Sequence, residues 1–149
     1  LEGMARRLKI CVGISLSFGL VSFISYAYNV PLLVAPLAAS ACILFAIPDA
    51  PVARPQNIIF GHAVAAAVGV LSCRFIGSGW LAGPIAITIA VFLMDSLDVM
   101  HPPAAATCFL ALASGHGFSF VLPVASGACV LVASSIIVKR AFARVFDHA

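Results

Sequence analysis

Charged residues are scarce in this chain: Asp, Glu, Lys and Arg make up only 9% of its 149 residues, whereas 63% are hydrophobic. Soluble domains usually carry about 25% charged residues, so the composition excludes a soluble protein and indicates an integral membrane protein. Most of the eight Lys and Arg residues flank the outermost apolar runs, at Arg6, Arg7, Lys9, Lys139, Arg140 and Arg144. Basic flanks of this kind set membrane orientation, so the net charge of +3 is a topological signal and not a nucleic-acid-binding surface. We expect both termini in the cytoplasm and the chain in a bacterial inner membrane.

Sequence patterns typical of metal centres and enzymes are also lacking. All five cysteines fall within apolar runs, without the spacing of metal ligands, at Cys11, Cys42, Cys73, Cys108 and Cys129. They are typical of small buried apolar residues. The His and Asp residues do not match a ligand pattern such as HExxH. We therefore expect no cofactor, no metal and no enzymatic activity. We also expect no cleavable signal peptide, because the first apolar run is long and lacks a small-residue cleavage site.

Proline, glycine and short polar stretches divide the apolar sequence into helices. Long helices are predicted over about residues 10–26, 58–73, 81–94 and 119–138, and short ones over about residues 37–47 and 102–113. Each short helix begins at proline, whose missing N–H group is tolerated in the first turn of a helix but not in its interior. Extended segments are expected before the short helices, over residues 31–35 and 95–101. The predicted fold class is therefore all-α integral membrane.

The two halves of the chain resemble each other. Residues 35–44 align with residues 101–110, and small residues at four-residue spacing recur in the helices that follow. These stripes comprise Gly61, Ala65, Gly69 and Cys73 in the first half, and Ala125, Cys129 and Ala133 in the second. Such stripes allow helices to approach closely in lipid. We predict one domain over residues 1–149 with a 3+3 internal repeat, about 9–74 and 75–140. Each repeat is a long helix, an extended segment with a short helix, and another long helix.

The short helices decide the topology. An extended segment of about six residues spans ~20 Å and twelve helical residues add ~18 Å, which is enough to cross a hydrocarbon core of ~30 Å. If both cross, the halves are inverted and the two short-helix N-termini meet near the midplane, as in many transporter sites. If both re-enter on their own side, the fold has four full spans and two re-entrant helices. The charges of Arg54 and Arg74 do not decide between the two, and we favour crossing.

The stretch around His101 is the strongest candidate for a functional site. It opens a short helix, and a helix N-terminus attracts anions through its partial positive charge and free N–H groups. The imidazole adds a hydrogen-bond donor, and ionisable groups at membrane depth are functional by default. The predicted substrate-binding residues are His101, Pro102, Pro103, Ala104, Thr107, Pro36, Ser40 and His62.

Other polar residues are predicted to have supporting roles. An anion-attracting vestibule is predicted from three loop residues, Arg54, Gln56 and Asn57, the alternative being a solvated loop. Asp95 and Asp98 precede His101 and are candidates for proton coupling with it, although a position at the wet end of the extended segment is the simpler interpretation. His116 lies between glycines and is expected to be exposed in a turn.

Together these motifs resemble the HPP integral membrane family. The resemblance covers residues 31–113 and rests on Met100-His101-Pro102-Pro103-Ala104, on residues 36–40, on the loop 51–57, and on Gly61-His62. The chain has alanine at 38 and 105, where the family favours glycine, and its loop has Arg54 before Gln56, the reverse of the family order. The resemblance implies four transmembrane helices and, from the plastid members of plants, transport of nitrite.

We therefore predict a membrane transporter or channel for a small monovalent anion, nitrite being the ion that the resemblance implies. The anion would bind between the two short-helix N-termini near the bilayer midplane. The expected partners are a small inorganic anion and the lipid bilayer, with no nucleic acid, and the small-residue stripes favour a homo-oligomer. Two other classes stay open. One is a non-transporting sensing or scaffolding module in the membrane, and the other is an intramembrane enzyme or metal site built from His62, His101, Asp95 and Asp98.

Overall fold

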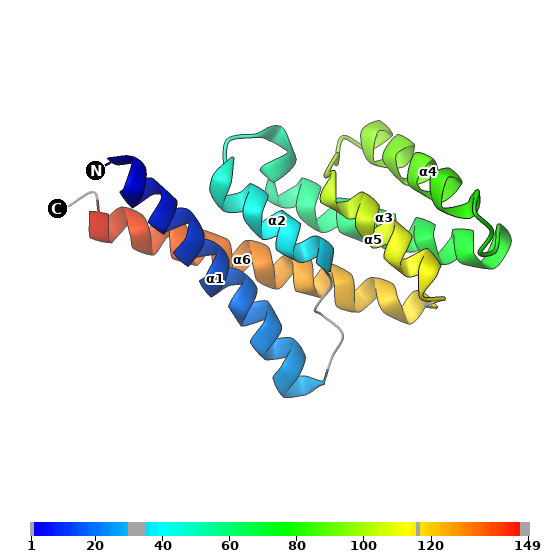
Figure 1. The fold of residues 1–149 in the computed structure, drawn as a ribbon, viewed down its shortest axis with the longest axis horizontal. Coiled ribbons are helices and arrows are strands. Elements are labelled where there is room, and N and C mark those ends of the chain that lie inside the picture. Colours follow the sequence, from blue (N-terminus) through cyan, green and yellow to red (C-terminus); the bar gives the residue numbers. More distant parts are fainter. Residues whose placement is uncertain (1, 30–34, 116, 147–149) are drawn as a thin grey trace.

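The computed structural model describes residues 2–29, 35–115 and 117–146 (Figure 1). Within these ranges six α-helices follow one another: α1 (Glu2–Tyr28), α2 (Ala35–Ala46), α3 (Pro55–Phe75), α4 (Ala82–Ser96), α5 (Pro103–Ala113) and α6 (Val121–Phe146). Two short 3-10 helices, η1 (Pro51–Ala53) and η2 (Phe118–Phe120), precede α3 and α6. The prediction of an all-α membrane fold is confirmed. His116 and residues 31–34 of the first predicted extended segment lie outside the described residues.

Three segments in the described part of the chain are long and apolar enough to cross a membrane: Gly3–Tyr28, Pro55–Phe75 and Phe118–Arg144. Helices α2, α4 and α5 are apolar but have only 12, 15 and 11 residues. At a rise of 1.5 Å per residue, α4 reaches roughly 22 Å, which is less than a hydrocarbon core of ~30 Å. The helix predicted over residues 81–94 is therefore present, but it is too short to count as a full span.

Helix α4 ends in a Schellman motif. The Val99 N–H donates to the Met94 carbonyl (2.9 Å), and the Asp98 N–H donates to the Asp95 carbonyl (3.0 Å). Asp98 has a φ of 53°, the left-handed conformation that this motif needs just after the C-cap. Consequently Asp95 belongs to α4, and the extended stretch predicted over residues 95–101 is confined to residues 99–101.

The described helices alternate in direction along the long axis of the molecule (Figure 1). The start of α1 and the end of α6 lie at the same end of that axis. Helices α2 and α5 both begin near the middle and run toward opposite ends, and their side chains meet there, since Ser40 of α2 contacts His101 just before α5. Opposed short helices are what the crossing topology requires, whereas the internal repeat stays a prediction.

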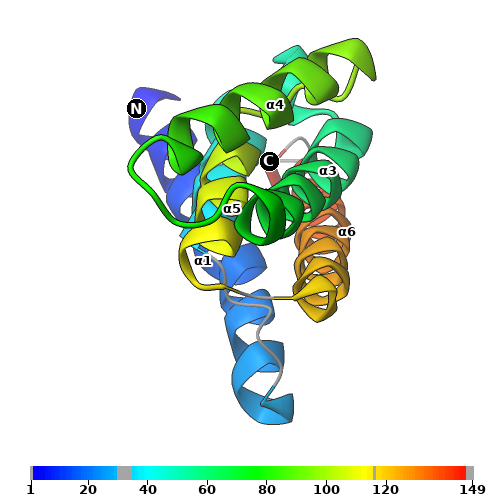
Figure 2. The same cartoon turned by 90° about the vertical axis from the view of Figure 1, so that its right-hand side faces the viewer.

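Helix α3 is shared by two apolar cores. One core joins α3 to α1, α2 and α6, with α1 packing on α2 and α6, and Leu37, Ile58 and Leu131 are among its fully buried members. The other packs α3 against α4 and α5, and includes Ala65 and Met94. In the view down the long axis, α3 and α5 lie between α4 on one side and α1 on the other (Figure 2). The middle of α3 is therefore enclosed by neighbouring helices.

The first small-residue stripe forms the contact between α3 and α5. A Cβ atom on Gly69 would overlap the Cys108 carbonyl oxygen and lie 2.7 Å from the Ala111 Cβ. Ala65, one turn earlier, is fully buried in the same core. The predicted close approach of helices along this stripe is therefore confirmed, because only glycine at position 69 leaves room for the α5 backbone.

The second stripe is less buried than the first, and its Ala125 is half-buried. Cys129 and Ala133 are exposed on α6, so the described chain does not cover this part of the stripe. Instead α6 turns Val124, Ala128 and Leu131 inward, all of them fully buried. These residues lie on a different face of the helix, and two of them have larger side chains that make more van der Waals contacts with α1 and α3.

Candidate functional site

Four polar side chains meet in the centre of the molecule, and each is 0% exposed. Ser40 of α2 places its Oγ 2.7 Å from His101 Nε2 and 2.8 Å from His62 Nε2. The other nitrogen of His62, Nδ1, lies 2.8 Å from Thr107 Oγ1 in α5. His101 Nδ1 lies 2.8 Å from the Val52 carbonyl oxygen in η1. The sequence singled out all four side chains as candidates, and the structure brings them together in what we call the central cluster.

Two residues of α3 position His101 for these contacts. Asn57 Nδ2 donates to the Met100 carbonyl at 3.0 Å and so fixes the backbone immediately before His101. A Cβ atom on Gly61 would lie 2.9 Å from His101 Cβ and 3.1 Å from the Val99 carbonyl oxygen. Glycine at this position therefore allows the extended residues 99–101 to lie directly on α3. The small-residue stripe signalled Gly61, but its contact with His101 was not predicted.

The start of α5 is not an open array of N–H groups. Pro102 and Pro103 have no N–H. The Ala104 N–H donates to the His101 carbonyl (2.9 Å), and the Ala105 N–H donates to the Pro102 carbonyl (3.0 Å). In this conformation the first donors of the helix are either missing or already used. Side chains of the central cluster, and not the backbone of the helix start, thus offer the groups that an anion would need.

The partners in the central cluster fix the positions of its hydrogens. A carbonyl oxygen only accepts, so His101 Nδ1 carries a hydrogen and donates it to Val52. In a neutral His101 the Nε2 atom is then bare, and Ser40 must donate its single hydroxyl hydrogen to it. Ser40 Oγ in turn accepts from His62 Nε2–H, which leaves His62 Nδ1 to accept from the Thr107 hydroxyl. The neutral cluster therefore has one assigned arrangement, a chain of donors that points from Thr107 to Val52.

The central cluster can also hold one more hydrogen. Ser40 Oγ lies 3.1 Å from the Pro36 carbonyl oxygen, a second acceptor for its hydroxyl. If His101 is protonated on both nitrogens, Ser40 Oγ accepts from the Nε2–H groups of both histidines and donates to Pro36 instead. All side chains of the cluster then still have partners, and the positive charge lies on His101. The positive cluster thus differs from the neutral one by one added proton on His101 and by the rotation of the Ser40 hydroxyl group.

The remaining predicted residues lie apart from the central cluster. Arg54 and Gln56 are exposed, which agrees equally with a vestibule and with a solvated loop. Asn57 does not share that position: it is 5% exposed, because its amide satisfies a buried backbone carbonyl. Asp95 and Asp98 are exposed at the end of α4, so the structure does not bring the two carboxylates into the buried cluster. Asp98 instead serves the Schellman turn.

The residues required for an intramembrane metal site do not converge. Within the described ranges, His, Cys, Asp and Glu side chains do not gather in groups of three or more. His62 and His101 are close, with ring centroids 5.2 Å apart and planes at 63°. Their Nε2 atoms both point at one hydroxyl oxygen, and the exposed carboxylates of Asp95 and Asp98 lie elsewhere.

Comparison with known proteins gives matches along nearly the whole chain. The profile of a family described as "HPP, transmembrane region" matches residues 2–146. Two transmembrane proteins of Dictyostelium discoideum are each 32% identical over an alignment of 121 residues, and the match covers 75% of this chain and 42% and 39% of theirs. The chain thus spans about two fifths of the length of these curated relatives. No solved structure matches the chain.

Proposed function

Since this chain belongs to the HPP transmembrane family and is an integral membrane protein, we propose that it transports a small monovalent anion together with a proton. The observation that carries this proposal is the central cluster, in which the Ser40 hydroxyl bonds the Nε2 atoms of both His62 and His101. Nitrite is the anion we propose, because the resemblance of residues 31–113 to the family implies it.

Stability alone is a weak reason for such a cluster. Interhelical hydrogen bonds in membrane proteins contribute about 0.6 kcal/mol each on average, and close packing of apolar side chains holds helices together equally well. Burying a polar group costs roughly 2–7 kcal/mol when it loses its partners, so a chain of four such groups makes the fold sensitive to every member. Polar and ionisable groups inside a membrane are therefore functional by default.

The two hydrogen arrangements of the central cluster supply a mechanism for taking up an anion. An anion alone in an apolar interior costs several kcal/mol. Protonation of His101 creates the opposite charge beside it, while Ser40 keeps a partner by donating to the Pro36 carbonyl. The loaded site then carries no net charge, so the cargo is equivalent to the weak acid of the anion. This proposal assigns proton coupling to His101, Ser40 and His62 and not to Asp95 and Asp98.

The anion would take the place of the Ser40 oxygen between the two histidines. In that position it accepts a hydrogen bond from His62 Nε2–H and from the Nε2–H of protonated His101, since both Nε2 atoms already lie within hydrogen-bond distance of Ser40 Oγ. Because the distances of 2.7 and 2.8 Å leave no space for a further atom, α2 must move relative to α3 and α5 during loading. The closed cluster is the empty state in this proposal.

We further propose that the chain works in a bacterial inner membrane with both termini cytoplasmic. The support is the position of the basic residues, which lie mainly at the start of α1 and at the end of α6, the places that the positive-inside tendency assigns to the cytoplasm. A homo-oligomer is part of the same proposal, since Cys129 and Ala133 leave small side chains exposed on α6, where another helix can approach closely.

Flux into liposomes that contain the purified chain tests this function. Nitrite, nitrate, formate or chloride is added outside, and a trapped pH dye reports the internal pH. Nitrite uptake with a proton acidifies the interior at a rate that an imposed potassium potential does not change. Liposomes without protein give the background of undissociated acid that diffuses through lipid.

Variants locate the transport site. His101→Gln and Ser40→Ala are expected to abolish nitrite-dependent acidification, since each removes a step of the proposed protonation. The matched control is Ser22→Ala, which removes a hydroxyl bonded to the Phe18 carbonyl in α1 and should transport normally. Nitrite flux that follows the membrane potential would exclude proton coupling, and flux that survives both cluster variants would exclude the site.

A non-transporting sensing or scaffolding module is the second candidate. The observation that favours it is that the relatives are more than twice as long as the segment they share with this chain, so the membrane part is joined to further sequence in them. If none of the four anions moves under any gradient, this candidate replaces the transporter.

A further inference from the structure

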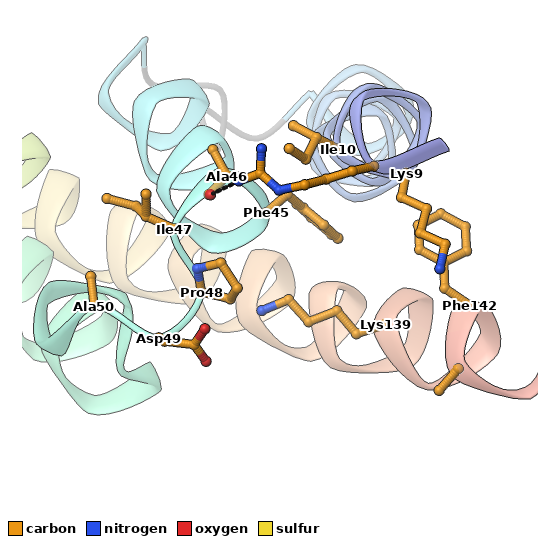
Figure 3. A pocket seen from close by; sticks show the side chains of 12 residues that line it. Lys9, Ile10, Phe45, Ala46, Ile47, Pro48, Asp49, Ala50, Lys139 and Phe142 are labelled. Atoms are coloured by element: carbon orange, nitrogen blue, oxygen red, sulfur yellow. Dashed lines mark hydrogen bonds between the residues drawn. The ribbon is translucent and has the colours of Figure 1, made fainter. Parts of the chain in front are cut away.

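A cavity of about 640 Å³ opens at the end of the molecule where α1 begins and α6 ends (Figure 3). Its wall is formed by the first turns of α1, by the end of α2 with the loop that follows, and by the last turns of α6. The residues of the central cluster do not line it. The proposed transport mechanism therefore leaves this cavity without a role.

The wall of the cavity is strongly basic. Three of the eight Lys and Arg side chains line it: Arg6, Lys9 and Lys139. Arg6 Nη2 donates to the Ala46 carbonyl at 3.2 Å, and Lys139 Nζ lies 5.5 Å from the centre of the Phe45 ring. In Figure 3 Lys139 extends from α6 into the cavity, toward Pro48 and Asp49. With Asp49 as the one carboxylate of the lining, the excess of positive charge suits an anion.

A narrower apolar groove of about 190 Å³ adjoins this cavity and shares Lys9 and Phe142 with it. The rest of the groove is lined by Ala5, Leu8 and Val12, which follow one another along one face of α1. The groove thus leads from the basic end of α1 toward its middle, which is the direction of the hydrocarbon core. Leu8 and Val12 are 57% and 43% exposed, so the described chain leaves this face uncovered.

We propose that the cavity and the groove together bind one anionic phospholipid. Its phosphate lies among Arg6, Lys9 and Lys139, and one acyl chain lies along α1 from Ala5 to Val12. Basic residues at the ends of membrane-spanning helices lie at the level of the lipid headgroups, and anionic lipids are attracted to such clusters. A phospholipid is the molecule that joins an anionic phosphate to an acyl chain, whereas a free anion fills the cavity and leaves the groove empty.

Lipid retention by the purified full chain tests this site. Native mass spectrometry measures the binding of phosphatidylglycerol and of phosphatidylcholine added to the same detergent, and we expect a clear preference for phosphatidylglycerol. The double variant Arg6→Gln/Lys139→Gln is expected to weaken phosphatidylglycerol binding about thirtyfold, because two basic contacts to the headgroup are lost.

The matched control removes the same charge from the neighbouring positions. Arg7 and Arg140 are exposed and do not line the cavity, so Arg7→Gln/Arg140→Gln should retain the preference. If the two double variants weaken phosphatidylglycerol binding equally, the lipid is attracted by the overall charge of the basic end, and the proposed site is wrong.

Two further measurements test the acyl chain. Val12→Trp fills the groove without changing any charge, and it is expected to weaken lipid binding even if the charge variants fold poorly. Soluble glycerol phosphate provides the headgroup without the chain, and it should not displace the lipid. Displacement by glycerol phosphate at the concentration of the lipid, or full binding by Val12→Trp, would overturn a lipid site and assign the cavity to a free phosphate.

Discussion

The centre of the molecule and its basic end treat polar groups in opposite ways. In the central cluster, side chains that are 0% exposed satisfy one another, and each hydrogen has an assigned place. At the basic end, Arg6 and Lys139 carry full charges around a cavity of about 640 Å³. The lesson is that the membrane interior admits polar groups as a closed uncharged network, whereas open charge is confined to the headgroup level. Substitutions in these two regions are therefore expected to differ in their effects on stability.

The largest effect is expected where α3 and α5 touch. Gly69→Ala forces a Cβ atom into the Cys108 carbonyl and Ala111, and overpacking of this kind costs about 3 kcal/mol. Reversible unfolding in mixed micelles, monitored by circular dichroism, measures the change. Gly19→Ala is the control, since nothing lies within 4 Å of a Cβ at that position of α1, and better helix propensity should stabilise it by up to about 1 kcal/mol. Equal destabilisation by both substitutions would contradict the close packing.

A smaller but still clear effect is expected from breaking the hydrogen-bonded chain. Ser40→Ala leaves His62 Nε2–H and His101 Nε2 without their shared partner, at a cost of about 2 kcal/mol in the free energy of unfolding. The same unfolding experiment applies. Ser22→Ala removes a hydroxyl that bonds only to its own helix, and it should change stability by less than about 0.5 kcal/mol. A neutral Ser40→Ala would mean that the two histidines find other partners.

The next largest effect on stability is expected at Asp98, in the turn between α4 and His101. Asp98 has a left-handed backbone, and a β-branched residue there costs roughly 1–2 kcal/mol. Asp98→Val should therefore lower the unfolding midpoint, whereas Asp98→Gly should leave it unchanged or raise it. If valine and glycine behave alike at this position, the left-handed turn is not what ends α4.

The smallest effect is expected at the basic end. Lys139→Gln removes a cation that lies over the Phe45 ring, a contact of about 0.5–1 kcal/mol at an exposed site. In zwitterionic micelles, which supply no anionic lipid, the free energy of unfolding should fall by no more than this amount. A loss as large as that of Ser40→Ala would show that the basic end supports the fold as strongly as the centre does.

The helix starts and the candidate site residues were predictable because prolines and polar side chains stand out in a sequence that is otherwise apolar. Proline without an N–H can only open a helix, so Pro36 and Pro103 marked α2 and α5. Polar side chains are rare in such a chain, so Ser40, His62 and His101 stood out as candidates. Their meeting requires only that the short helices begin near the same point.

Helix faces and backbone partners were not predictable, for two physical reasons. Lipid and protein interior are equally apolar, so a helix such as α6 carries little pattern to show whether Cys129 or Val124 faces inward. Carbonyl groups are common to all residues, so nothing in the sequence marks Val52 or Pro36 as partners of the cluster. The left-handed turn at Asp98 was missed because aspartate also occurs in many other turn conformations.

The Val52 carbonyl also affects whether protons could leak across the membrane through the central cluster. A proton hops along a hydrogen-bonded wire only if every group passes on one hydrogen and receives another in its place. The chain from Thr107 to Val52 ends in an oxygen that has no hydrogen to give. The central cluster has a place for one added proton but no continuous path for a stream of them, so the proposed carrier would move its cargo without also leaking protons across the membrane.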